Sequence, residues 1–151
     1  MFLHVCNSWL LAQLLHPLLF ILSGYFWSGE PLPLAAFIII FVFSSIVSMP
    51  SLFLGWLFLS IIVYSEYVIP LKFIFWLLTS AALILLTIWI LILVIGGLEE
   101  EMLRNFLYAI PGIISIWVVS IIRYRKFRKL VDESVYKKNI LLDKNESIHE
   151  N

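Results

Sequence analysis

The chain has 151 residues, of which 62% are hydrophobic and 13% are charged. An average soluble domain has about 45–50% apolar and about 25% charged residues. This composition excludes an ordinary soluble protein, because a fold of this size could not cover so much apolar surface. The formal net charge is zero, yet eight of the ten Lys and Arg residues follow Ile122. We therefore predict an all-α fold, a polytopic transmembrane helical bundle of one domain.

The first apolar segment predicts a crossing over about residues 8–28. Trp9 and Trp27 lie 18 positions apart, which corresponds to roughly 27 Å on a helix and matches the hydrocarbon thickness of a bilayer. The two indoles are therefore predicted to mark the two interfacial belts. The segment lacks the basic start and small-residue cleavage site of a secretory signal, so we expect it to be retained.

The second apolar block covers about residues 34–66 and has Pro50 near its middle. As a straight helix it would reach about 50 Å, against a hydrocarbon core of about 30 Å. Pro50 removes one backbone hydrogen bond and predicts a kink or break between Val47 and Met49. Two separate crossings would have about 15 residues each, below the usual minimum of roughly 17. We therefore predict one kinked crossing, which gives four in total, with five crossings as the alternative.

Two further crossings are predicted over about residues 71–97 and 105–123, so that the bundle covers residues 1–129. A short basic stretch and a polar tail over residues 130–151 follow, and we expect this tail to be helical for only a few turns. Basic residues beside a crossing are retained on the cytoplasmic side, which places the C-terminus there. The acidic run from Glu99 to Glu101 is then outside. With four crossings the N-terminus is also cytoplasmic, and with five it is outside.

Polar residues form a stripe on the first crossing, where Gln13 and His16 share a helix face that Ser23 extends. Polar side chains in lipid turn toward other helices or a water-filled cavity. A functional interpretation is a pH-sensitive pore lining, because His titrates near neutral pH. A structural interpretation is interhelical hydrogen bonding, worth about 1 kcal/mol or less per bond. The sequence offers no acidic partner at matching depth, which favours packing.

Small residues form a second stripe beside Pro50, with Ser44, Ser48, Ser51 and Gly55 at i, i+4, i+7 and i+11. Small side chains let helix backbones approach closely, which increases the van der Waals contact between helices in lipid. This face is predicted to be a helix contact, either within the bundle or between subunits.

Five basic residues lie within seven positions after the last crossing. They are Arg123, Arg125, Lys126, Arg128 and Lys129. Besides setting the topology, they are predicted to contact anionic lipid headgroups, at about 1 kcal/mol for each basic residue near the surface. The cluster is short and tied to the membrane, which argues against nucleic acid as a partner.

The sequence shows no metal-ligand spacing, no glycine-rich phosphate loop and no paired intramembrane acids, so we expect no enzyme activity, cofactor or metal. Cys6 and His4 lie close together but have no third group to orient them. The main functional hypothesis is a self-associating bundle that acts as a pore, channel or membrane-perturbing effector, with defence or toxicity as one setting. An accessory or scaffold subunit of a larger membrane complex is the alternative. A small carrier with its site at the Pro50 kink is a weaker one.

Overall fold

The computed structural model describes residues 1–28, 34–95 and 109–149, and these residues form six α-helices and no strand. The helices are α1 (Phe2–Ser28), α2 (Leu34–Val47), α3 (Met49–Tyr64), α4 (Ile69–Ile95), α6 (Ala109–Ile122) and α7 (Tyr124–His149). The predicted all-α fold is confirmed for this part of the chain. The predicted helix limits at Gly97 and Asn105, and the acidic run from Glu99 to Glu101, lie outside the described residues.

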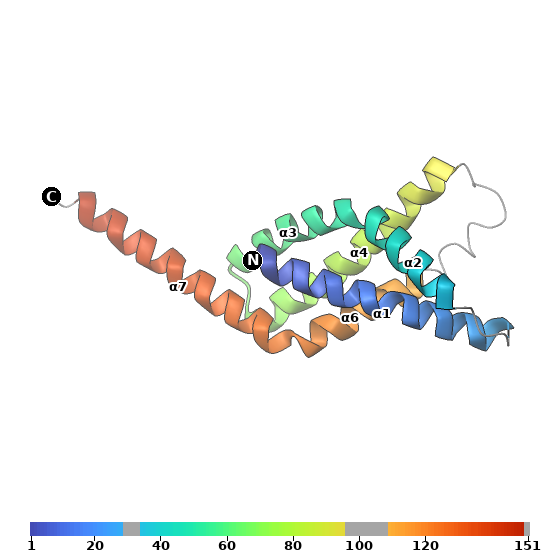
Figure 1. Cartoon of the computed structure of the whole chain (residues 1–151). Coiled ribbons are helices and arrows are strands. Elements are labelled where there is room, and N and C mark those ends of the chain that lie inside the picture. The colour runs from blue at the N-terminus through green and yellow to red at the C-terminus, as the bar shows by residue number, and fades with distance from the viewer. Residues whose placement is uncertain (29–33, 96–108, 150–151) are drawn as a thin grey trace.

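Five of these helices pack into an elongated bundle, and the sixth projects from one end of it (Figure 1). Helix α1 lies along α6, α3 lies along α4, and α4 also contacts α6, while α2 and α3 together cover α1. The N-terminus, the end of α3 and the start of α7 lie at the same end of the bundle. The distal half of α7 extends away from all the other helices.

Helix length and composition identify the candidate crossings among the described residues. Helices α1 and α4 are long and apolar enough to cross a bilayer, and α2 and α3 pass the same test only together, as a bent pair that is either one broken span or a re-entrant loop. Helix α6 is apolar but has only 14 residues. Two or three helices could therefore cross, which fits a membrane protein, and the total of four crossings stays a prediction.

The predicted break at Pro50 is confirmed. Helix α2 ends at Val47, α3 begins at Met49, and their axes differ by 53°. Pro50 occupies the first turn of α3, where its missing N–H breaks no helical bond. The Ser48 N–H still donates to the Ser44 carbonyl at 3.0 Å. The Ser48 carbonyl accepts from the Leu52 N–H at 3.1 Å. The chain therefore turns sharply while the N–H and the carbonyl of Ser48 both stay bonded.

Helix α1 begins at Phe2, several residues before the predicted start near residue 8. The sequence suggested a polar leader here because His4, Cys6 and Asn7 cluster together. Val5 and Ser8 are nevertheless buried inside the bundle. The packing of this first turn explains why the helix extends to the chain's beginning.

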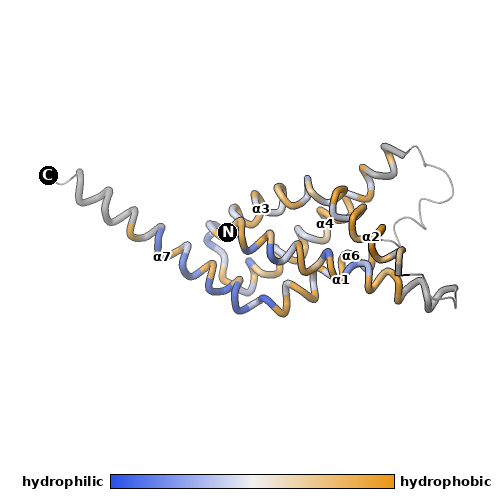
Figure 2. Tube along the Cα trace, viewed as in Figure 1, coloured by the Kyte–Doolittle hydropathy of each residue, from blue (hydrophilic) through white to orange (hydrophobic). Residues whose placement is uncertain are grey.

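Apolar side chains cover the outside of the bundle, and small polar ones lie inside it. Large residues such as Leu18, Phe53 and Leu78 are exposed, whereas Ser8, Gln13 and Ser115 are buried. Helices α2, α3 and α4 are mostly hydrophobic, and hydrophilic residues gather along α7 (Figure 2). In lipid, helices gain little from burying apolar groups against one another and associate through close packing and hydrogen bonds. The distribution therefore suits a bundle surrounded by hydrocarbon.

Helix α7 is anchored to the bundle by Phe127 and Val131, both of which are fully buried. The Phe127 ring lies 5.3 Å from that of Phe73 on α4 and 6.3 Å from that of His4 on α1. The helix continues to His149, which is longer than the few turns expected from the sequence. Two exposed intrahelical ion pairs at i, i+4 lie beside this anchor: Arg128 with Asp132 at 3.9 Å and Lys129 with Glu133 at 3.8 Å.

Replacing Phe127 with Ala should release α7 from the bundle, because a buried Phe→Ala change costs about 3–5 kcal/mol in well-packed sites. Hydrogen exchange measured on the protein in nanodiscs should become faster over residues 124–134. Ile140→Ala removes a half-exposed apolar side chain from the projecting half of α7, and should leave the exchange of residues 124–134 unchanged. Equal effects of the two variants would contradict the anchoring role of Phe127.

Candidate functional site

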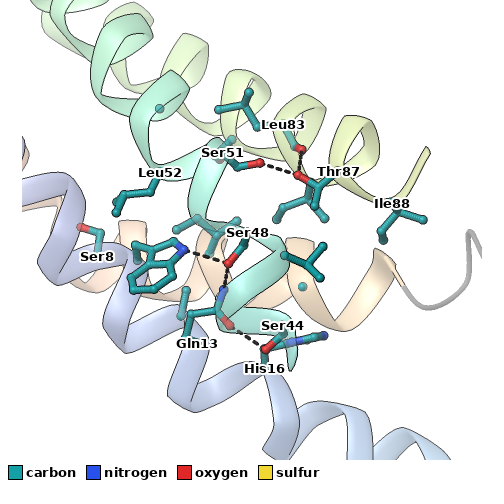
Figure 3. Close-up of a pocket in the computed structure, with 18 of the residues that line it drawn as sticks. Ser8, Gln13, His16, Ser44, Ser48, Ser51, Leu52, Leu83, Thr87 and Ile88 are labelled. Carbon is teal, nitrogen blue, oxygen red and sulfur yellow. Dashed lines mark hydrogen bonds between the residues drawn. The ribbon is translucent and has the colours of Figure 1, made fainter. Parts of the chain in front are cut away.

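A cavity of about 400 Å³ lies between α1, the α2–α3 break, α4 and α6 (Figure 3). Its wall is mainly apolar, with a few polar groups near the break. The residues that line it include Ala12, Gln13, His16, Ser48, Ser51 and Thr87. Cavities of about 300–1,000 Å³ with apolar walls and few polar groups are typical of small-molecule sites. It is the strongest candidate site in the described part of the chain.

The Ser48 hydroxyl is the centre of a hydrogen-bonded cluster that joins the break to α1. It accepts from Gln13 Nε2 at 2.6 Å and from Trp9 Nε1 at 3.0 Å. It also donates to the Ser45 carbonyl at 3.4 Å. Ser44 Oγ donates to Gln13 Oε1 at 2.8 Å. A hydroxyl has one donor and two acceptor positions, so all of the hydrogen-bonding capacity of Ser48 is used.

A second polar contact joins α3 to α4 on the other side of the break. Thr87 Oγ1 donates to the Leu83 carbonyl at 2.7 Å, and the Ser51 hydroxyl lies within hydrogen-bond distance of Thr87 Oγ1 (Figure 3). Because the Thr87 proton points to Leu83, Ser51 is the donor in the contact between the two hydroxyls. The polar wall of the cavity thus comes from α1, the break and α4.

Gly55 continues this face one turn further along α3, where it is buried. A Cβ atom placed on Gly55 would lie 3.7 Å from Leu83 Cδ1 and 3.7 Å from Val5 Cγ1, which are ordinary contact distances. The small-residue face therefore contacts two helices of the same chain: α1 through Ser44 and Ser48, and α4 through Ser51 and Gly55. Pro50 is exposed and does not line the cavity.

The polar stripe of α1 is partly brought into the same site. Gln13 and His16 both line the cavity, and the His16 ring packs edge-on against Phe20 with centroids 6.2 Å apart. His16 also lies beside Gly112 of α6. Ser23 belongs to α1, but its side chain is outside the described part of the structure.

The five basic residues are not gathered into one site. Arg123 lies at the junction of α6 and α7, and its Nε is buried without a hydrogen-bond partner among the described residues. Arg125, Lys126, Arg128 and Lys129 are exposed. Of the five, Arg128 lines a second cleft, between α7 and the start of α4.

Sequence reasoning missed two contributors to the site. It assigned Trp9 to an interfacial belt, but the Trp9 indole N–H donates to the Ser48 hydroxyl at the break. Trp9 and Gln13 are spaced by i, i+4, which could have indicated a shared face. The pairing of Thr87 with Ser51 could not be predicted, because it depends on which residue of α3 comes to lie opposite Thr87.

Comparison of the chain with protein-family models, with curated proteins and with solved structures found no match. The described residues also contain no group of three or more His, Cys, Asp or Glu side chains placed to hold a metal ion.

Replacing Ser48 with Ala should lower the thermal stability of the protein in detergent, because Gln13 and Trp9 then lose their shared acceptor. Interhelical hydrogen bonds in membrane proteins average about 0.6 kcal/mol each, so we expect a loss of about 1–2 kcal/mol. Ser60→Ala is the matched control, because that hydroxyl bonds only to the carbonyl of Trp56 in its own helix. A Ser48→Ala protein as stable as the Ser60→Ala protein would rule out Ser48 as a stabilising junction.

Proposed function

We propose that the chain is a non-enzymatic membrane protein that binds a small, mostly apolar molecule in the cavity at the α2–α3 break. The observation that carries this proposal is the cavity of about 400 Å³ with its largely apolar wall. An apolar cavity of about 150 Å³ already takes up benzene, and the space here is well above that size. Molecules dissolved in the bilayer are the natural source of such a ligand.

The break supports the proposal, because discontinuous helices commonly form binding sites in membrane proteins. The bend of 53° between α2 and α3 lies on the wall of the cavity, at Ser48 and Ser51. A carrier that takes up and releases a ligand at the break is therefore favoured over the pore predicted first.

The polar groups limit the chemistry of the ligand. Gln13, Ser44 and Ser48 bond to one another, and Ser51 bonds to Thr87. A ligand would therefore be held mainly by dispersion and shape. His16 adds one imidazole that can donate or accept a hydrogen bond. We infer an apolar body with at most one polar group, directed to the α1 side of the cavity.

The self-associating pore, channel or effector and the accessory subunit remain alternative proposals. The hydrogen bonds among Gln13, Ser44 and Ser48 join α1 to the break, which favours a packed bundle over an open pore. The small-residue face contacts α1 and α4 of the same chain, so self-association would use other, lipid-facing surfaces.

For the orientation we propose that both termini are cytoplasmic. The N-terminus and the basic start of α7 lie at the same end of the bundle, and basic residues beside a crossing favour the cytoplasmic side.

A photoreactive fatty acid tests the binding proposal on the whole chain in nanodiscs. Illumination should label peptides that line the cavity as well as peptides that face lipid. Ala12 is buried and lines the cavity, whereas Ala82 is exposed on α4. Ala12→Leu should lower cavity labelling about tenfold. The larger side chain would overpack the site when the ligand is bound, at a cost of about 1–3 kcal/mol. Ala82→Leu, the same substitution on the lipid-facing side, should leave labelling unchanged.

Two results would contradict the proposal. One is wild-type labelling confined to lipid-facing residues. The other is rapid leakage of a soluble dye from sealed liposomes that contain the protein, which would favour the pore.

A further inference from the structure

A second cleft, of about 740 Å³, lies at the end of the bundle where α7 begins. It separates the α3–α4 connection from one face of α7. Its wall consists of Tyr67, Val68, Ile69, Pro70, Lys72, Tyr124, Arg128, Val131, Asp132, Val135 and Tyr136. These residues come from two segments far apart in the sequence, and no residue of the central cavity is among them.

The cleft is amphipathic. Val68, Ile69 and Pro70 give it an apolar lip on the side where α4 begins. The α7 side is lined by Tyr124, Arg128 and Tyr136, each of which has a polar group at the end of its side chain. Tyr side chains combine an apolar ring with a polar tip and concentrate at the level of lipid headgroups.

The charges of the cleft favour an anion. Lys72 lies at its base, with its side chain buried and Nζ donating to the Val63 carbonyl at 2.7 Å. Arg128 lies at its rim, and its Nε is 3.9 Å from Asp132. This ion pair is long and exposed, so it holds the guanidinium only weakly. The exposed Arg125, Lys126 and Lys129 raise the positive potential around the cleft.

We propose that this cleft binds the phosphate group of an anionic phospholipid. Arg128 contacts the phosphate oxygens, with the Tyr124 and Tyr136 hydroxyls as further donors, because guanidinium groups form short charge-assisted bonds with phosphate. The glycerol and the first acyl carbons lie against Val68, Ile69 and Pro70. This apolar lip favours a lipid over free phosphate, and basic pockets beside membrane helices are known to hold lipid headgroups.

The site differs from a diffuse basic surface in that it assigns different roles to neighbouring cations. Arg128 lines the cleft, whereas Lys129, the next residue, does not. The Lys129 side chain is 78% exposed and lies 3.8 Å from Glu133. The two residues thus have similar charge, exposure and i, i+4 partners, and only their position relative to the cleft differs.

Native mass spectrometry of the full-length protein tests the proposal, with phosphatidylglycerol added to delipidated protein. Arg128→Gln should reduce the bound phosphatidylglycerol about tenfold, because it removes the charge-assisted contacts. Lys129→Gln should reduce it less than about threefold, the effect of a screened surface charge. Tyr124→Phe keeps the ring and removes one donor, and should give a loss between these two.

Other results of this experiment would contradict or narrow the proposed lipid site. Equal losses from Arg128→Gln and Lys129→Gln would overturn the proposal in favour of diffuse attraction. Phosphatidylcholine binding as tightly as phosphatidylglycerol would also overturn it. Displacement of the lipid by millimolar inorganic phosphate would show that the phosphate alone is recognised and that the lip adds no affinity. A circular dichroism spectrum identical to that of the wild type confirms that each variant is folded.

Discussion

A helix that bends inside hydrocarbon must find partners for the polar groups at the bend, because no water is present to replace them. The Ser48 hydroxyl meets this requirement for α2 and α3, since it donates to the Ser45 carbonyl and accepts from both Gln13 and Trp9. The two contacts with Gln13 and Trp9 attach the bend to α1. The bend is therefore held by the Ser48 hydroxyl and is the joint at which α1 packs against α2 and α3.

The central cavity follows from this joint. Ser48 and Ser44 contact α1, while Ser51 and Gly55, one and two turns further on, contact α4. The cavity lies between this bent element and helices α1, α4 and α6, each of which contributes residues to its wall. At the end of the bundle the buried Lys72 ammonium bonds to the Val63 carbonyl in the last turn of α3. Buried polar groups thus hold both ends of α3, and one candidate binding site lies beside each of them.

The sequence predicted these elements unequally well. Pro50 located the break because its effect is local, and the spacing of the small residues identified a helix contact. The spacing could not say that α1 and α4 are the partners, because that depends on how the helices assemble. The cavity and the role of Thr87 were not predictable for the same reason. The length of α7 was underestimated, since the sequence does not show that the bundle buries Phe127 and Val131.

Cysteine labelling at the bend tests the central claim, that the break between α2 and α3 lies within the bilayer. Met49 is exposed on the surface of the bundle at the bend, and Tyr67 is exposed in the connection before α4. With Cys6 replaced by Ser, a membrane-impermeant maleimide should label Tyr67→Cys readily from one side of the membrane. Met49→Cys should stay unlabelled from both sides until the membrane is dissolved. Rapid labelling of Met49→Cys in intact membranes would place the break at the surface and contradict a single bent crossing.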